Sequence, residues 1–88
     1  MSTAELLLEC KNGLGISPDS TAFDGILTQK ILVVQLFMTN AGVPASEMDN
    51  PLAAGTVVMG VNDLWDLKSG EVKFSPVFFT LVSQLAAG

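Results

Sequence analysis

The sequence predicts an all-α fold: a small four-helix domain with a long central helix and a short extended loop before the C-terminal helix. Two kinds of helix start predict it. A Ser or Asn followed by Pro stands before a mostly apolar run at three places, which are Ser17-Pro18, Asn50-Pro51 and Ser75-Pro76. The polar side chain accepts a bond from a free N–H of the first turn, and proline has no N–H to satisfy there. Ser2 and Glu5 have the spacing of a capping box, which is a fourth start.

The first two helices are predicted over Thr3–Lys11 and Pro18–Asn40. Asn12 and Gly13 end the first, because glycine readily adopts the left-handed conformation that closes many helices. Apolar residues fill several faces of the second helix, so it is central, or its outer side docks on a neighbouring subunit. Alternative caps for this helix, should its first turn be irregular, are Ser20, Thr21 and Asp24. Residues expected on its outer face, in contact with another chain or with the third helix, are Leu32, Leu36 and Phe37.

The third helix is predicted over Leu52–Leu67, although two glycines and a β-branched run weaken its helix propensity. A strand here would place Pro51 and both glycines within or beside it, which strands tolerate poorly. As a helix, the segment could approach another helix closely. The small residues that would allow this approach are Ala53, Ala54, Gly55 and Gly60.

The C-terminal part is predicted to contain a turn, a short extended segment and the last helix. The turn spans residues 68–71 with Gly70 at its tight position, residues 72–74 are extended and could pair as an edge strand, and the helix covers Val77–Ala86. At 88 residues the chain forms one domain, residues 1–88.

The composition points to contacts between chains. Hydrophobic residues make up 49% of the chain and charged residues 15%, against about 25% charged in a typical soluble domain. A small monomer has too much surface to bury so many apolar side chains, so some of them are expected to face other chains. The alternative is a monomer with an unusually apolar surface.

The charge balance argues against direct binding to nucleic acid. The net charge is −5, and there are four lysines and no arginine, whereas phosphate binding requires clustered basic residues. An acidic surface is compatible with the wall of a channel through which DNA moves without binding. Polar residues interrupt the longest uncharged stretch, Ile31–Ser46, and no signal peptide is recognisable, so we expect no membrane association and a cytoplasmic site of synthesis.

Few residues offer catalytic or metal-binding chemistry. The chain has no histidine, and its single cysteine, Cys10, is expected to be a small buried hydrophobe. Asp63 and Asp66 would share one helix face, but without histidine or a dense set of acids they are expected to be solvated rather than metal ligands. No phosphate-binding loop is present. We expect no enzymatic activity, no cofactor and no metal.

Aromatic and charged residues towards the C-terminus are candidates for an interface. Trp65 either fills the core beside the last helix or anchors a contact between proteins, as tryptophan often does. The segment 68–84 is a candidate docking element for the next component of an assembly, against the alternative of a plain turn with solvated charges. Its charges are Lys68, Glu71 and Lys73, and its aromatic anchors are Phe74 and Phe78.

The order of these elements resembles the small helical head-to-tail connector proteins of tailed bacteriophages and prophages. The resemblance rests on the long apolar second helix and on a few short segments. These are Gly13-Leu14-Gly15-Ile16, Leu64-Trp65-Asp66-Leu67, Ser69-Gly70 and Phe74-Ser75-Pro76-Val77-Phe78-Phe79. It covers nearly the whole chain. The absence of arginine is a departure, because many connectors carry basic residues near their end.

The resemblance implies a structural protein in many copies, forming a ring beneath the portal protein. DNA would pass through the ring without sequence-specific binding, and the tail or a stopper (head-completion) protein would dock on it. The protein would be assembled in the cytoplasm of the host bacterium and reside in the neck of the virion. The competing interpretation is a small cytoplasmic adaptor or regulatory domain that binds a partner helix or peptide in an apolar groove.

Overall fold

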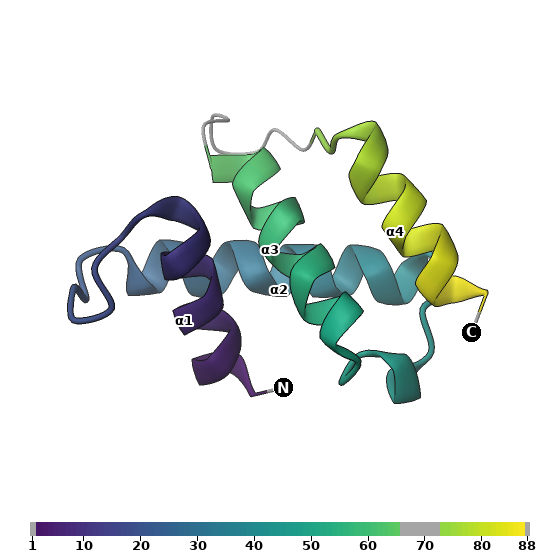
Figure 1. The fold of residues 1–88 in the computed structure, drawn as a ribbon, viewed down its shortest axis with the longest axis horizontal. Coiled ribbons are helices and arrows are strands. Elements are labelled where there is room, and N and C mark those ends of the chain that lie inside the picture. Colours follow the sequence, from purple (N-terminus) through teal and green to yellow (C-terminus); the bar gives the residue numbers. More distant parts are fainter. Residues whose placement is uncertain (1, 66–72, 88) are drawn as a thin grey trace.

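The computed structural model describes residues 2–65 and 73–87 of the chain (Figure 1). It contains four α-helices and one short 3-10 helix. They are α1 (Thr3–Leu14), α2 (Asp24–Asn40), η1 (Ala45–Glu47), α3 (Pro51–Trp65) and α4 (Pro76–Ala86). The prediction of a small four-helix all-α domain is confirmed.

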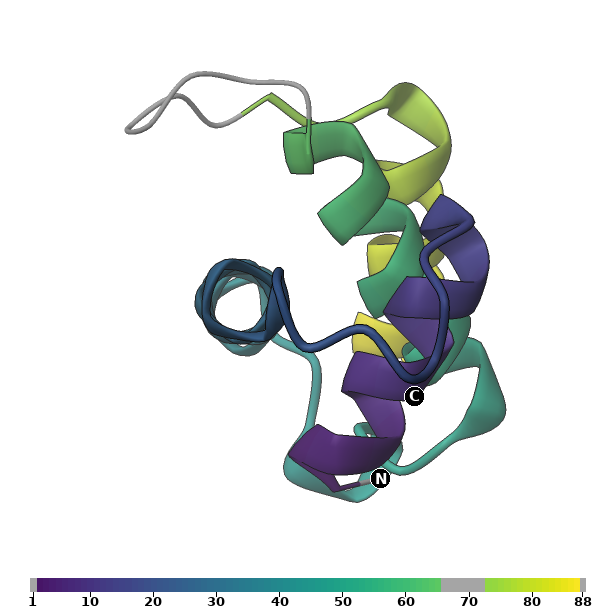
Figure 2. The same ribbon diagram turned by 90° about the vertical axis from the view of Figure 1, so that its left-hand side faces the viewer.

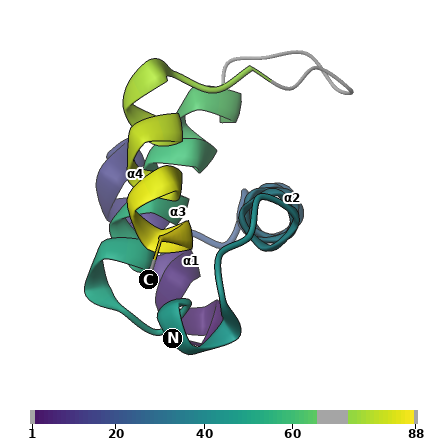
Figure 3. The same ribbon diagram turned by 90° about the vertical axis from the view of Figure 1, so that its right-hand side faces the viewer.

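The longest helix, α2, lies across the other three. In Figure 1, α2 runs behind α1, α3 and α4, and the two turned views show it almost end-on, to one side of the layer that the others form (Figures 2 and 3). The side of α2 that packs on this layer carries four fully buried residues, Leu27, Ile31, Val34 and Met38. The rest of α2 is not surrounded, so its outer side faces solvent in the single chain.

The predicted capping box starts α1. Glu5 N donates to Ser2 Oγ over 3.2 Å, and Ser2 N donates to Glu5 Oε1 over 3.1 Å. The helix continues past its predicted end at Lys11 and includes Asn12 and Gly13. It closes at Gly15, whose φ of +73° is left-handed. The sequence-based end was wrong because Gly13 has a packing role: a Cβ there would lie 2.8 Å from Val58 Cγ1 of α3.

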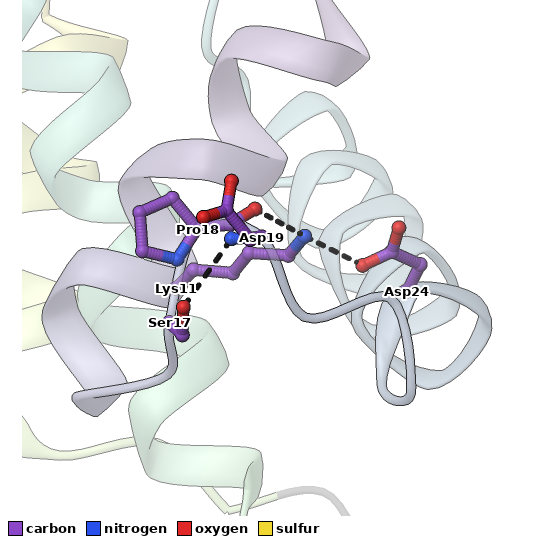
Figure 4. Close-up of polar contacts among 5 residues, drawn as sticks. All are labelled: Lys11, Ser17, Pro18, Asp19 and Asp24. Atoms are coloured by element: carbon purple, nitrogen blue, oxygen red, sulfur yellow. Dashed lines mark hydrogen bonds and ion pairs between the residues drawn. The ribbon is translucent and has the colours of Figure 1, made fainter.

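The predicted start of the second helix at Ser17-Pro18 was wrong. Ser17 accepts bonds from two backbone N–H groups, Asp19 N to its Oγ (3.4 Å) and Ser20 N to its carbonyl (3.0 Å), so it stabilises a turn. A second turn follows, and α2 begins at Asp24 without a side-chain cap at Phe23. A tertiary contact fixes this path, because the buried Lys11 side chain of α1 binds both Pro18 O and Asp24 (Figure 4).

The starts of α3 and α4 are confirmed. Leu52 N donates to Asn50 Oδ1 over 2.9 Å, and Phe78 N donates to Ser75 Oγ over 3.3 Å. The helical interpretation of the third segment is also confirmed, with α3 described as far as Trp65; residues 66 and 67 lie outside the described part of the chain.

Close packing of α3 depends on Gly60. A Cβ at Gly60 would lie 2.7 Å from the Phe78 ring of α4 and 2.8 Å from Val34 of α2, so only glycine fits between these helices. Lys73 and Phe74 lead into α4 without strand structure, and no strand occurs in residues 2–65 and 73–87. Val72 and the predicted turn at residues 68–71 lie outside the described residues.

Candidate functional site

The outer side of α2 carries large apolar side chains that no part of the described chain covers. Their exposed fractions run from 40% at Phe23, directly before the helix, to 62% at Leu36. The set, called the α2 strip below, consists of Phe23, Ile26, Leu32, Val33 and Leu36. From these fractions the strip exposes on the order of 500 Å² of apolar surface, within the range of the largest patch on a typical monomer, a patch that is often functional.

The α2 strip carries no charge. The helix contains only two charged residues, and both bind groups of their own chain. Asp24 Oδ1 lies 2.8 Å from Lys11 Nζ, and Lys30 Nζ donates to the carbonyl of Leu64 at the end of α3 over 3.1 Å. The strip can therefore be covered by another protein without burying an unpaired charge, which costs several kcal/mol in an apolar interface.

Aromatic rings stand near both ends of the strip. At the start of α2, the Phe23 and Trp65 rings meet edge to face with centroids 5.6 Å apart. At the other end, Phe37 meets Phe79 of α4 at 5.8 Å. Trp65 is half-buried and packs beside the start of α2. The sequence had predicted that it lies in the core beside the last helix or in an interface. Aromatic side chains at such positions commonly supply much of the energy of a protein interface.

The other predicted interface residues fall into three groups. Leu32 and Leu36 belong to the α2 strip and are exposed. Phe37 is half-buried, and Phe74 and Phe78 are buried and stack on each other at 4.2 Å, so Phe78 supports this end of the domain from inside. Lys73 is exposed, whereas Lys68 and Glu71 lie outside the described residues.

Sequence reasoning missed Phe23, Ile26 and Val33 as members of the strip. Apolar residues occur on every side of α2, so the sequence pattern does not show which side faces outward. The side that faces outward depends on the layer against which α2 packs and on the start of the helix at Asp24 rather than Pro18. A weak signal was available: no acidic residue occurs between Asp24 and Glu47.

A polar cluster connects α1 to the start of α2 (Figure 4). Lys11 is buried, and its ammonium group is held by Asp24 and by the carbonyl of Pro18 at 3.5 Å. The neighbouring Cys10 is fully buried, and this burial raises the pKa of its thiol to about 11. A thiol with this pKa is protonated near neutral pH and is a poor nucleophile. The arrangement is that of a structural tie between helices.

Asp63 likewise connects two helices. Its Oδ2 accepts bonds from the backbone N and the Oγ of Ser75, both over 2.9 Å, and so fixes the start of α4 against α3. Asp66, its predicted companion, lies outside the described residues. Within those residues, no three side chains of His, Cys, Asp and Glu are grouped so that they could hold a metal ion. None of the described helices is long and apolar enough to span a membrane.

A groove between α1 and α3 is the second surface of interest. It has a volume of about 650 Å³ and receives no residue from α2. Its lining, called the α1–α3 groove below, consists of Glu9, Asn12, Gly13, Asp49, Pro51, Ala54, Gly55 and Val58. Small and apolar residues of α3 line one side, and Glu9 lies on the α1 side. The sequence did not predict this groove, because it depends on the distance between two helices.

Comparison with protein-family models, with curated proteins and with solved structures finds no match to this chain.

Proposed function

We propose that this protein is a structural assembly subunit that works through contacts between chains, and not an enzyme. The observation that carries the proposal is the α2 strip, an uncharged and mostly apolar face on the longest helix. Removing apolar surface from water is the dominant driving force of protein association. The charged residues nearest the strip are already paired within the chain, so association costs little electrostatic free energy.

The assembly proposed is the head-to-tail connector of a tailed phage or prophage. The order of helices and the proline-started last helix support this assignment by resemblance, and the acidic balance suits a ring through which DNA passes without binding. In this role, copies of the chain form a ring beneath the portal protein and present a surface to the tail or stopper protein. The site of action is the neck of the virion, after assembly in the host cytoplasm.

The experiment that tests this function combines the purified chain with the portal protein of the same phage or prophage genome. Native mass spectrometry and electron microscopy would then show a ring of many copies bound to the portal. The test variant is Leu36→Glu, which places a charge in the α2 strip. Its matched control is Gln84→Glu, which places the same charge at an exposed position of α4. Failure of the wild-type chain to bind the portal in any oligomeric form contradicts the connector function.

The α1–α3 groove favours a second candidate function, that of an adaptor domain binding one partner helix or peptide. The two functions differ in stoichiometry. An adaptor remains a monomer and binds its partner one to one, whereas a connector subunit forms a closed oligomer of many copies.

A further inference from the structure

We propose that the α2 strip of one copy packs into the α1–α3 groove of the next copy. This inference rests on the proposed function, because it names the surface that covers the strip in the ring. The contact is heterologous: two different surfaces meet, and each copy uses one surface towards each of its neighbours.

Gly55 is the first reason to expect a close neighbour in the groove. It lies within α3, is exposed, and has no positive φ. A Cβ at this position would meet nothing within 4 Å, whereas a Cβ at Gly13 or Gly60 would collide with another helix. Glycine is the weakest helix former after proline, and packing within the single chain does not require it here. A helix backbone approaching from another copy explains it.

The fit of α2 to the groove is the second reason. By the helical rise per residue, α2 is about 25 Å long and α3 about 22 Å long, so the two can lie along each other over most of their lengths. Glu9 in the groove would repel a helix that carries exposed acids, as α1 does. The outermost side of α4 presents the polar residues Thr80 and Ser83. Among the described helices, α2 carries the most exposed large apolar side chains; α4, which carries no charge, exposes only Val77 and Phe79.

The positions of the two surfaces are the third reason. Gly55 lies roughly 140° around α3 from Gly60, which faces Val34 of α2. The groove therefore opens on a different side of the molecule from α2. Two complementary surfaces on different sides generate a ring when the rotation between copies closes, and a filament when it does not.

The area is adequate for such a contact. Covering the α2 strip would bury on the order of 500 Å² on one copy, and an equal area on its neighbour would bring the total to about 1,000 Å², the lower bound for a specific interface. The groove lining supplies only part of the neighbour's share, so the surfaces of α1 and α3 beside the groove must supply the rest. In a closed ring every copy takes part in two such contacts. Assembly is then more stable than one contact between two copies would be, because releasing one copy from the ring requires two contacts to break.

The test mixes two variants that each damage one surface. Leu36→Glu disables the strip and leaves the groove, and Gly55→Leu fills the groove and leaves the strip. Each variant alone is expected to be a monomer by analytical ultracentrifugation. Mixed in equal amounts, they are expected to form a dimer and nothing larger, because only one intact strip and one intact groove remain to meet. Circular dichroism confirms that each variant is folded, and Asn12→Trp replaces Gly55→Leu if that variant does not fold.

Three other outcomes overturn the inference. If the groove variant assembles like wild type, the strips pair with each other or with a different surface. If the mixture stays monomeric, the strip and the groove do not meet. If the wild-type chain stays monomeric on concentration, both alone and with the portal protein, no contact between copies exists. If wild type forms a ring and the groove variant forms a ring of the same mass, only this inference is refuted. If the chain never binds the portal protein, the proposed function is refuted.

Discussion

The ammonium group of Lys11 lies 2.8 Å from the carboxylate of Asp24, and this ion pair joins α1 to the first turn of α2 (Figure 4). Lys11 is buried although it is charged, so its partner matters more than that of a surface lysine. The pair fixes the path of the chain into the first turn of α2. The side of α2 that faces solvent is opposite the four residues packed on the other helices, which are Leu27, Ile31, Val34 and Met38.

Removal of Asp24 is the first prediction. Asp24→Asn leaves the buried ammonium of Lys11 without its counter-charge, and we expect it to lower the free energy of unfolding by about 2 kcal/mol. Lys11→Met removes the charge and retains an apolar side chain of similar length, so we expect a smaller loss. Urea unfolding followed by circular dichroism measures both. Equal stability of Asp24→Asn and wild type would show that the pair contributes nothing.

The glycines of α3 offer a second prediction with a built-in control. Gly55→Ala removes a poor helix former at an open position and should stabilise the single chain by about 0.5–1 kcal/mol. Gly60→Ala forces a Cβ against Phe78 and Val34 and should destabilise it by about 1–3 kcal/mol. Thermal unfolding measures whether each variant is more or less stable than wild type. A stable Gly60→Ala protein would contradict the close packing of α2, α3 and α4.

The capping box predicts a pH dependence. Hydrogen bonds from the backbone N–H and the hydroxyl of Ser2 lower the pKa of Glu5 in the folded chain. A lowered pKa means that this group stabilises the fold above its unfolded pKa, and that the contribution is lost as the pH falls through the folded value. Glu5→Gln should therefore reduce the acid-side loss of stability. Urea unfolding at a series of acidic pH values checks this, and identical profiles for the two proteins would contradict it.

The buried thiol gives a prediction on the alkaline side. Burial raises the pKa of Cys10 from 9.0 to about 11, so the folded state resists ionisation that the unfolded state allows. Stability should fall as the pH rises through that interval, and Cys10→Ala should lack this fall. Alkylation of Cys10 by iodoacetamide near neutral pH should also be slow until the chain unfolds. Rapid labelling of the native protein would show that the thiol is accessible.

The sequence predicted features that depend on local chemistry and missed those that depend on distant contacts. The starts of α1, α3 and α4 follow from Ser2, Asn50 and Ser75, whose side chains bind backbone groups within three residues. The start of α2 was mispredicted because Ser17 has the same local pattern, while the Lys11–Asp24 pair sets the actual path. Leu32 and Leu36 were anticipated as outer residues, but the full strip and the groove depend on how the helices pack.

The measurement that tests the central claim most directly is the mass of the assembled protein with and without a charge in the α2 strip. Sedimentation equilibrium of wild type, Leu36→Glu and Gln84→Glu, with or without the portal protein, compares the same added charge on and off the strip. We expect wild type and Gln84→Glu to assemble alike and Leu36→Glu to remain a folded monomer. Assembly of Leu36→Glu equal to that of wild type would contradict the claim that the α2 strip joins the chains.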